Sequence, residues 1–291
     1  MKRPPARLRL VADGDEPLLG FLVRRGGIAE EQARAAIGRG GAFIRGRRTR
    51  ELLARVRAGD RVEVSLLEPE RAALSRERIL HLDDLLLAVD KPPGIAAQED
   101  LAGGPALPDL CSALLREMGE THTQVLLVHR LDRGTSGVTA LARTRRAQAA
   151  LLREFREHRV DKRYLALVAP APASEGGSIE AEVGGRAART LWRVLERHEG
   201  AALIEASPET GRTHQIRIHL AGLGSPLLGD RQHGGTFLMT GPGGERHDFP
   251  RPMLHARSLA LRHPSGSDLR LEAPLPEDLS AAQRFLRALA R

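Results

Sequence analysis

Lysine, aromatic residues and cysteine are all scarce in this sequence. The chain has 45 basic residues, but only three are lysines, and two of these, Lys91 and Lys162, lie well inside the sequence. Tyr164 is the only tyrosine. The lone cysteine, Cys111, excludes an intramolecular disulfide and a cysteine-rich zinc site, and is typical of a reducing compartment. Because these residue types are so rare, the two internal lysines and the tyrosine are candidates for specific roles.

Long hydrophobic runs are also missing. No stretch approaches the roughly 18 consecutive apolar residues that a membrane-spanning helix needs. The opening segment, MKRPPARLRLVADGDEP, is basic but has no apolar core that could serve as a signal peptide. The sequence therefore predicts a cytoplasmic protein without a membrane partner.

Positive charge is concentrated near the beginning of the chain. The formal net charge is +8, and residues 1–70, with 15 basic and 10 acidic side chains, supply +5 of it. Between Arg24 and Arg50 there are eight arginines and only two acidic residues. Such a cluster is typical of a surface that binds nucleic-acid phosphates, although a solvated basic surface has the same composition.

A chain of 291 residues is long enough for a large domain and a small one. Residues 1–70 are predicted to form a small module with two helices, near 18–22 and 29–37, and strands at 42–44 and 61–64. Residues 71–80 are charged and are interpreted as a linker. Residues 81–291 are predicted to form the main domain. We expect a helix capped by Thr144 that buries Leu151, Leu152 and Phe155, and an amphipathic helix over 276–291.

The segment HRLDRGTSG, residues 129–137, is the strongest local signal. A short apolar strand, residues 125–128, is expected to lead into it, and Gly134 and Gly137 indicate a turn. Asp132 stands between Arg130 and Arg133, and nearby cations favour an ionised carboxylate. A fixed, charged aspartate suits a nucleophile or an electrostatic stabiliser, whereas an ordinary surface turn is the alternative.

Three further segments carry candidate residues. Lys91 precedes a rigid Pro-Pro-Gly turn, and either points toward a ligand or caps the turn. Residues 160–168 predict a strand on which Lys162 and Tyr164 share one face. In ETGRTHQIRIHLAGL, residues 209–223, Thr213 is expected to cap a helix, with Arg212 at its entry.

Two other functions compete with an enzyme built on Asp132. A metal hydrolase could use the histidines, but no pair has the spacing of three or four that helical metal sites prefer. The histidines in question are His129, His214, His219 and His255. A non-catalytic RNA-binding protein would explain the basic cluster, but would leave Asp132 and Tyr164 without a role.

The motifs LLLAVDKPPGI, HRLDRGTSG, DKRYLALV, TGRTHQIRIHL, PLLGD and RPMLHA occur in the order found in the RluA family of pseudouridine synthases. Residues 79–265 resemble that family, and residues 1–70 resemble the small RNA-binding domain named after ribosomal protein S-four. The first resemblance implies that Asp132 is the catalytic aspartate, Tyr164 the active-site tyrosine, and Arg212 the arginine paired with the aspartate. Asp90 and His233 depart from the family pattern, which usually has asparagine and an aromatic residue there.

The resemblance also implies an α+β fold, with a small N-terminal module joined to a catalytic domain built on a mixed, largely antiparallel sheet. The expected reaction isomerises uridine to pseudouridine in structured RNA without a cofactor or a metal. Large-subunit ribosomal RNA is the first expectation and transfer RNA the alternative, and a monomer is expected. The target base must be flipped out or already unpaired. Candidate RNA-binding residues are Arg130, Arg133, Lys91, Lys162, His129 and Thr135.

Overall fold

The computed structural model describes residues 7–38, 40–66, 73–98 and 105–289. The chain divides into two compact units, residues 1–73 with 98–106 and residues 74–97 with 107–291, and each is considered by itself. Within the described residues, no helix combines the length and apolar character that crossing a membrane requires.

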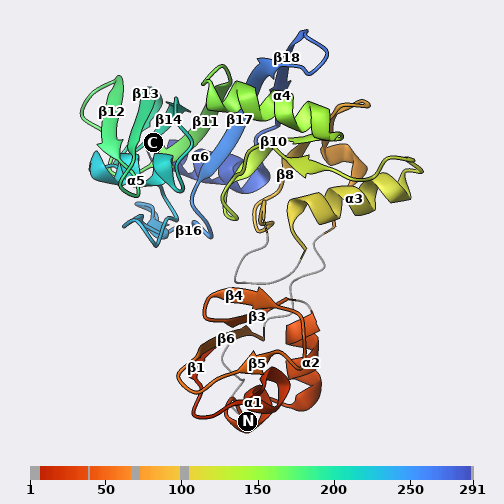
Figure 1. Cartoon of the computed structure of the whole chain (residues 1–291). Helices are drawn as coiled ribbons and strands as arrows, with labels where there is room; N and C mark the ends of the chain where they lie inside the picture. Colours follow the sequence, from red (N-terminus) through yellow and green to blue (C-terminus); the bar gives the residue numbers. More distant parts are fainter. Residues whose placement is uncertain (1–6, 39, 67–72, 99–104, 290–291) are drawn as a thin grey trace. The chain divides into compact units, whose positions relative to one another are not determined.

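The first unit packs two helices against small antiparallel sheets (Figure 1). The helices α1 (Leu18–Arg24) and α2 (Glu30–Gly38) lie where the sequence predicts them. Its four-stranded sheet has the order β1 (Arg7–Val11), β6 (Arg61–Ser65), β3 (Ala42–Ile44) and β4 (Arg47–Thr49), and a separate pair joins β2 (Glu16–Pro17) to β5 (Arg55–Val56). Apolar side chains of both helices and of β6 form its core because they recur at helical and strand spacing, among them Phe21, Ile37 and Val62.

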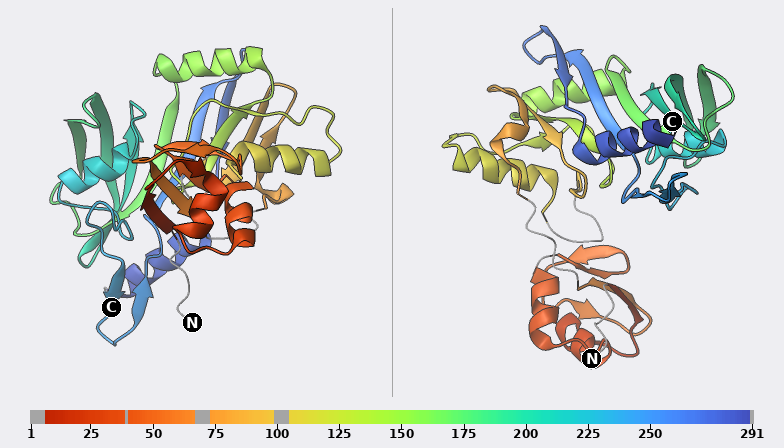
Figure 2. Two further views of the ribbon diagram at one scale, coloured as in Figure 1. Left: turned by 60° about the horizontal axis from the view of Figure 1, so that its bottom comes forward. Right: turned by 180° about the vertical axis from the view of Figure 1, so that it is seen from behind.

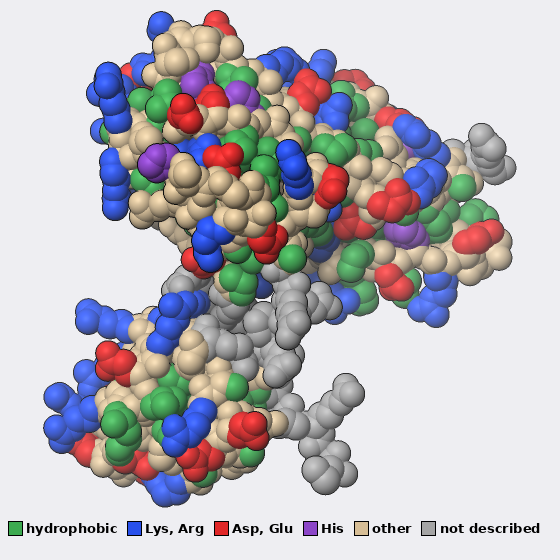
Figure 3. Space-filling view, turned by 90° about the vertical axis from the view of Figure 1, so that its right-hand side faces the viewer, with side chains coloured by type: hydrophobic (Ala, Val, Ile, Leu, Met, Phe, Trp, Pro, Cys, Tyr) green, Lys and Arg blue, Asp and Glu red, His purple; other side chains and the backbone are tan. Residues whose placement is uncertain are grey.

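Acidic partners neutralise much of the basic cluster in the first unit. Arg24 pairs with Asp13 and Glu16, and Arg34 pairs with Glu30 at 2.6 Å. Arg45 pairs with Asp60. Basic side chains still protrude from this unit between acidic ones (Figure 3). Arg39, another member of the cluster, lies outside the described residues.

The second unit begins earlier than the sequence analysis placed it. A single 3₁₀ turn, η1 (Arg76–Arg78), and the edge strand β7 (Ile79–Leu82) belong to it. Arg78 donates to Asp90 at 2.6 Å and so ties the turn to the neighbouring strand. Residues 74–80 are therefore part of this unit rather than of a linker, and residues 71–72 lie outside the described residues.

A ten-stranded mixed sheet forms the centre of the second unit, as the sequence analysis predicted. The main path has the order β12 (Gly176–Glu182), β13 (Ala187–His198), β14 (Ala201–Pro208), β11 (Asp161–Val168), β17 (Leu254–Arg262), β10 (Ser136–Ala142), β8 (Leu86–Lys91) and β7. Two more strands complete it: β18 (Asp268–Glu272) pairs with β17, and β9 (Leu126–Leu127) with β10. Of these pairs only β10 with β17 is parallel, in the middle of the sheet.

Helices cover both faces of this sheet (Figures 1 and 2). Ala166 and Val168 of β11 pack in a cluster with α5 (Gln215–Gly222), whereas Leu167, on the opposite face, packs with α6 (Glu277–Leu289). The helix α4 (Arg145–Arg156) packs on β10 and β17. The remaining elements are α3 (Leu107–Glu117) and a hairpin of β15 (Leu238–Thr240) and β16 (Arg246–Asp248).

Two details differ from the sequence analysis. Leu152 of α4 is 39% exposed rather than buried, although Thr144 caps this helix as predicted, its hydroxyl accepting from the Ala147 amide at 3.1 Å. Gly137 does not lie in a turn. It belongs to β10 and pairs with Ala256 of the parallel strand β17.

Candidate active site

The loop 129–135, between β9 and β10, is anchored at its start by His129. The Nε2 atom of His129 accepts a hydrogen bond from the Ala140 amide at 2.9 Å, and its ring stacks on Phe155 with the centroids 4.8 Å apart. Burial lowers the pKa of His129 to about 3, so the ring is neutral and serves as an acceptor. His129 thus lines the site, but its Nε2 atom is already occupied by the hydrogen bond from the Ala140 amide.

Lys91 links the loop 129–135 to the turn at residues 92–95. Its Nζ donates to the carbonyl oxygens of Ile95 at 2.9 Å, Pro92 at 3.1 Å and Arg133 at 3.4 Å. The Gly94 amide also donates to the Arg133 carbonyl. Lys91 is fully buried, and burial lowers its pKa to about 7. The expectation that Lys91 contacts RNA is wrong, because its side chain does not reach the surface.

Arg251 holds the end of the loop. Its Nη1 donates to the Gly134 carbonyl at 3.0 Å, while Nε and Nη2 bind Asp278 of α6 at 2.6 and 2.9 Å. Gly137 then lets β10 run against β17: its φ is +112°, and a Cβ there would lie 2.2 Å from the Ala256 carbonyl oxygen. These contacts fix where Asp132 projects.

Arg217 is the arginine that contacts Asp132. Its Nη1 lies 3.4 Å from Asp132 Oδ2, and its Nε and Nη2 bind both oxygens of the buried Asp230 at 2.7 Å. Burial opposes ionisation of Asp230, but the hydrogen bonds from Arg217 outweigh it and lower the Asp230 pKa. Arg217 is therefore fixed by one carboxylate and directed at another.

Arg212 does not pair with Asp132, contrary to the prediction from the sequence. Arg212 Nε faces the Ala187 carbonyl, 3.4 Å away. The reason lies in how α5 begins: His214, not Thr213, is the N-cap, with a left-handed φ of 58°, and the helix starts at Gln215. The Thr213 hydroxyl instead accepts from Arg130. Arg217 lies in the first turn of the helix and is directed at the loop.

Tyr164 projects from the centre of the sheet. Its backbone neighbours on β14 and β17 are Ala206 and Ala256, whose small side chains leave room for the ring. A bulge between Arg163 and Tyr164 changes the pairing with β17 at this point. Burial, together with the Asp132 charge, raises the Tyr164 pKa, so the phenol stays neutral at ordinary pH.

Asp132, Tyr164 and Arg217 line one cavity of about 700 Å³. Its walls come from the loop 129–135, the end of α4, β11 and the start of α5. Five other cationic side chains surround it: Arg130, Arg156, Lys162, Arg186 and Arg212. Lys162 donates to the Thr210 carbonyl at 3.0 Å, and burial lowers its pKa to about 8. The volume suits a nucleotide-sized ligand, and the cations suit an anionic one.

Comparison with known proteins identifies the scaffold. The family model for RNA pseudouridylate synthase matches residues 85–222. An uncharacterized RNA pseudouridine synthase of Mycobacterium bovis is 39% identical over 227 residues, which cover 72% of this chain and 72% of that protein. The chain belongs to the RNA pseudouridylate synthase family. The predicted resemblance to the RluA group is thereby confirmed.

Other members of this family support the same assignment. Ribosomal large subunit pseudouridine synthase D of Xanthomonas campestris is 37% identical over 261 residues, 80% of this synthase and 77% of that one. The structure called human RNA pseudouridylate synthase domain containing 4 has a TM-score of 0.61 and 26% identity, and covers 72% of this chain and 93% of that chain. The enzyme is an isomerase that acts on RNA.

The remaining predicted residues of the synthase take different positions. Arg130 lies in the cavity wall, whereas Arg133 lies outside it and donates to the Gly94 carbonyl at 2.8 Å. Thr135 lines the cavity, and its Oγ1 is buried without a hydrogen-bond partner among the described residues. Such a hydroxyl is available to a bound ligand.

The histidines of the metal-hydrolase alternative do not assemble. His255 and His219 are buried and contact Ser136 and Thr190 respectively. Only His214 approaches Asp132, with Nε2 3.9 Å from Oδ2, and its Nδ1 lies 3.3 Å from His233. Burial lowers the His214 pKa even though Asp132 opposes this shift. Sequence reasoning missed Arg217 and Asp230 as partners of the site, although both lie in recognised motifs.

Proposed function

We propose that this synthase converts uridine to pseudouridine in large-subunit ribosomal RNA, with Asp132 as the catalytic carboxylate. The observation that carries the proposal is the position of Asp132: a carboxylate held by Arg217 in the wall of a cavity with five further cations. In the reaction the bond from the ribose C1′ to uracil N1 breaks and a bond from C1′ to C5 forms. N1 gains a proton and the hydrogen on C5 leaves as a proton, so the reaction is redox-neutral.

Asp132 supplies the negative charge that this exchange requires. Its carboxylate engages the sugar or the base while the glycosidic bond is broken, and Arg217 keeps it oriented through a charge-assisted contact. Because Arg217 is itself bound by Asp230, its guanidinium does not need to reorganise during the reaction.

Tyr164 provides a wall for the uracil. Its neutral ring offers a flat surface for stacking while the free base turns, and Tyr164 lines the same cavity as Asp132. The target nucleotide has to leave its stack to enter the cavity. We assign Arg130, Arg212 and Lys162, which line the cavity, to binding phosphates on either side of it.

The proposal that the substrate is ribosomal RNA rests on the names of two relatives and on the exposed arginines of the first unit. Relatives from Xanthomonas campestris and Nitrosomonas europaea, 37% identical to this chain, are named ribosomal large subunit pseudouridine synthase D. The first unit carries exposed arginines on a small α/β scaffold of the kind expected to bind structured RNA. We assign it to binding the RNA outside the cavity.

Tritium release tests the substrate. Large-subunit ribosomal RNA and total transfer RNA, each transcribed with uridine labelled at C5, are incubated separately with the full chain. We expect release from the ribosomal transcript at one or a few sites and none above background from transfer RNA. Release from transfer RNA alone would replace the proposed substrate with the alternative, and release from neither would contradict both.

A further inference from the structure

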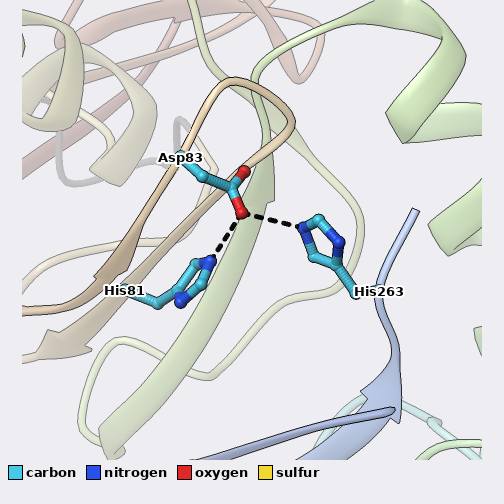
Figure 4. A group of neighbouring side chains, drawn as sticks. All are labelled: His81, Asp83 and His263. Atoms are coloured by element: carbon cyan, nitrogen blue, oxygen red, sulfur yellow. Dashed lines mark hydrogen bonds and ion pairs between the residues drawn. The ribbon is translucent and has the colours of Figure 1, made fainter. Parts of the chain in front are cut away.

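Two histidines and one aspartate converge at a point that shares no residue with the active-site cavity. Nε2 of His81 lies 2.8 Å from Oδ2 of Asp83, and Nε2 of His263 lies 3.0 Å from the same oxygen (Figure 4). The ligand atoms of all three lie within 4.8 Å of one another. His81 belongs to β7, Asp83 to the turn after it, and His263 directly follows β17.

The Asp83 carboxylate is fixed by its own turn. Oδ1 accepts hydrogen bonds from the amides of Leu85 and Leu86, both at 2.8 Å, which leaves Oδ2 directed at the two rings. Burial opposes ionisation, but the hydrogen bonds from His81 and from these amides lower the Asp83 pKa. The group is therefore an anion held in place before any ligand arrives.

His263 provides a second and independent observation. Only 8% of this residue is exposed, and among the described residues its Nε2 has no partner in hydrogen-bond geometry, although it faces Asp83. Its Nδ1 lies 2.6 Å from Ser265 Oγ and 3.2 Å from the Ser265 amide. A buried ring nitrogen that faces a carboxylate without a good hydrogen bond is satisfied when a cation binds between them.

We propose that His81, Asp83 and His263 form a zinc site. The set of ligand atoms, two imidazole nitrogens and one carboxylate oxygen, is typical of Zn²⁺. Mg²⁺ and Ca²⁺ prefer ligand sets made of oxygen atoms alone. At Zn–ligand distances of about 2.0–2.1 Å, tetrahedral ligand atoms lie roughly 3.3 Å apart. Both N–O distances, 2.8 and 3.0 Å, are slightly shorter than this spacing, and the three ligand atoms lie within 4.8 Å of one another, so zinc binding requires the two rings to rotate toward a common centre.

The surroundings fit a bound divalent ion. The His81 and Asp83 side chains are 29% and 36% exposed, so an ion and a fourth ligand, water, have access. Nδ1 of His263 accepts from the Ser265 amide at 3.2 Å and lies 2.6 Å from Ser265 Oγ, so zinc on Nε2 requires the other tautomer, in which Nδ1–H donates to Oγ in place of the amide contact. Arg143 donates to the Asp83 carbonyl at 2.8 Å, and its charge is balanced by Glu120 at 2.7 Å.

A bound zinc ion would connect two segments of the second unit that are far apart in the sequence. His81 lies on the edge strand β7 and Asp83 in the turn after it, near the beginning of the second unit, whereas His263 directly follows the central strand β17. An ion that joins them closes a long loop of chain and stabilises the folded second unit against the unfolded chain. Because none of the three residues lines the cavity, zinc is assigned to stability and not to the isomerisation.

Calorimetric titration of the untagged, chelator-treated full chain with Zn²⁺ tests the proposal. We expect one equivalent per chain, and weakening of at least about tenfold in His81→Gln and His263→Gln. Ser265→Ala, which removes only the orienting hydroxyl, should weaken binding by about tenfold. His233→Gln is the matched control, because His214 and His233 form the other close histidine pair, 3.3 Å apart, and this variant should bind zinc as the wild type does.

Thermal unfolding gives a readout that does not depend on the calorimetric signal. At a zinc concentration a hundredfold above Kd, the melting temperature of the wild type should rise by roughly 5–10 °C, and that of His81→Gln should not change. A visible spectrum typical of four-coordinate Co²⁺ in the wild type should be missing in His263→Gln. Three results would each overturn the proposal: no zinc binding by the folded wild type, equal binding by both ligand variants, or loss of binding in His233→Gln. The first would show that the three side chains form only an ion-pair cluster without a metal.

Discussion

Arg217 lies between two carboxylates that have different tasks. Asp230, which is 1% exposed, binds its Nε and Nη2, and Asp132, whose side chain is 25% exposed, contacts its Nη1. The planar guanidinium makes this possible, because it presents several donors in fixed directions whereas a lysine presents a single point charge. The orientation of Asp132 thus depends on a residue that is itself buried and fully paired.

Arg217→Lys should reduce kcat by at least about 100-fold, because the charge remains but the bidentate contact with Asp230 and the aim at Asp132 are lost. The matched variant Arg212→Lys should lose less than about tenfold, since Arg212 faces the Ala187 carbonyl. Single-turnover rates with saturating RNA measure both, and thermal melting shows that each variant is folded. Equal losses in the two variants would return the pairing role to Arg212.

The sequence analysis expected a cation beside Asp132 but chose the wrong one of two nearby arginines. The motif GRTHQIR contains Arg212 and Arg217, and helix periodicity does not reveal where the first turn begins. The left-handed His214 is the N-cap of the helix, which therefore starts at Gln215, and Arg217 in its first turn contacts Asp132. Residue types were readable from the chain, but the backbone angle at one non-glycine residue was not.

His255 should make the protein sensitive to acid. It is fully buried beside Ser136, and burial lowers its pKa to about 4, below the roughly 6.5 of an unfolded chain. As the pH falls from 6.5 toward 4, the unfolded chain takes up the proton first, so stability is lost across this window. Relative to His255→Asn, the unfolding free energy of the wild type should fall by about 1.4 kcal/mol per pH unit.

Urea unfolding at pH 7.5, 5.5 and 4.5 measures this difference. His122→Asn, which replaces an exposed histidine in the same way, is the control for the loss of one imidazole. The same pH dependence in wild type and His255→Asn would show that folding does not lower the pKa of His255 and would contradict this prediction.

At the level of elements, the parallel contact between β10 and β17 decides where the catalytic loop ends. This pair extends over Ser136 with His255 and Gly137 with Ala256, and the loop 129–135 directly precedes it. Close approach of the two backbones requires a residue without Cβ and with positive φ, and Gly137 meets both conditions. The position of Asp132 therefore depends on a glycine in a strand.

Gly137→Ala should lower the free energy of unfolding by at least about 3 kcal/mol, because the new Cβ would lie 2.2 Å from the Ala256 carbonyl oxygen and φ is +112°. Gly211→Ala is the control, since nothing lies within 4 Å of a Cβ there and its φ is not in the left-handed region. Chemical denaturation compares the two variants with the wild type. A loss below about 1 kcal/mol in Gly137→Ala would mean that the strands separate easily and do not fix the loop.

Elements with strong local signals were predictable, and those defined by long-range pairing were not. The capped helix α4, the strand β11 and the amphipathic α6 all follow from spacing and capping. The strand β14 was missed, because AALIEASP has little alternation and its place between β11 and β13 comes from pairing with both. Gly137 was assigned to a turn for the same reason: the sequence shows a glycine but not the strand beside it.

In the whole molecule, the two units have different tasks. The second carries the cavity and the isomerisation, and the first is proposed to bind RNA outside that cavity. Counts of charge along the sequence overstated the basic cluster, since Arg24 and Arg45 have acidic partners that the fold brings close, and Arg34 pairs with Glu30 one turn earlier in α2. The net positive charge of the chain, +8, still favours a polyanion.

Removal of residues 1–73 should weaken RNA binding and flatten its salt dependence, because log K falls with log salt by about one unit for each phosphate contact. Filter binding between 50 and 200 mM salt measures the slope for the full and the shortened chain. Circular dichroism establishes that the shortened chain is folded. An unchanged slope would show that the arginines of the first unit contact no phosphates.

The most direct test of the account is tritium release from C5-labelled ribosomal RNA in a single turnover, comparing the wild type with Asp132→Asn. The substitution removes the charge and keeps the shape, so RNA binding should persist within about threefold while release falls to the enzyme-free background. Substrate and product have equal mass, but the hydrogen at C5 must leave if pseudouridine forms. Release from the wild type alone is the predicted result. Release by Asp132→Asn at the wild-type rate would remove Asp132 from the chemistry and contradict the account.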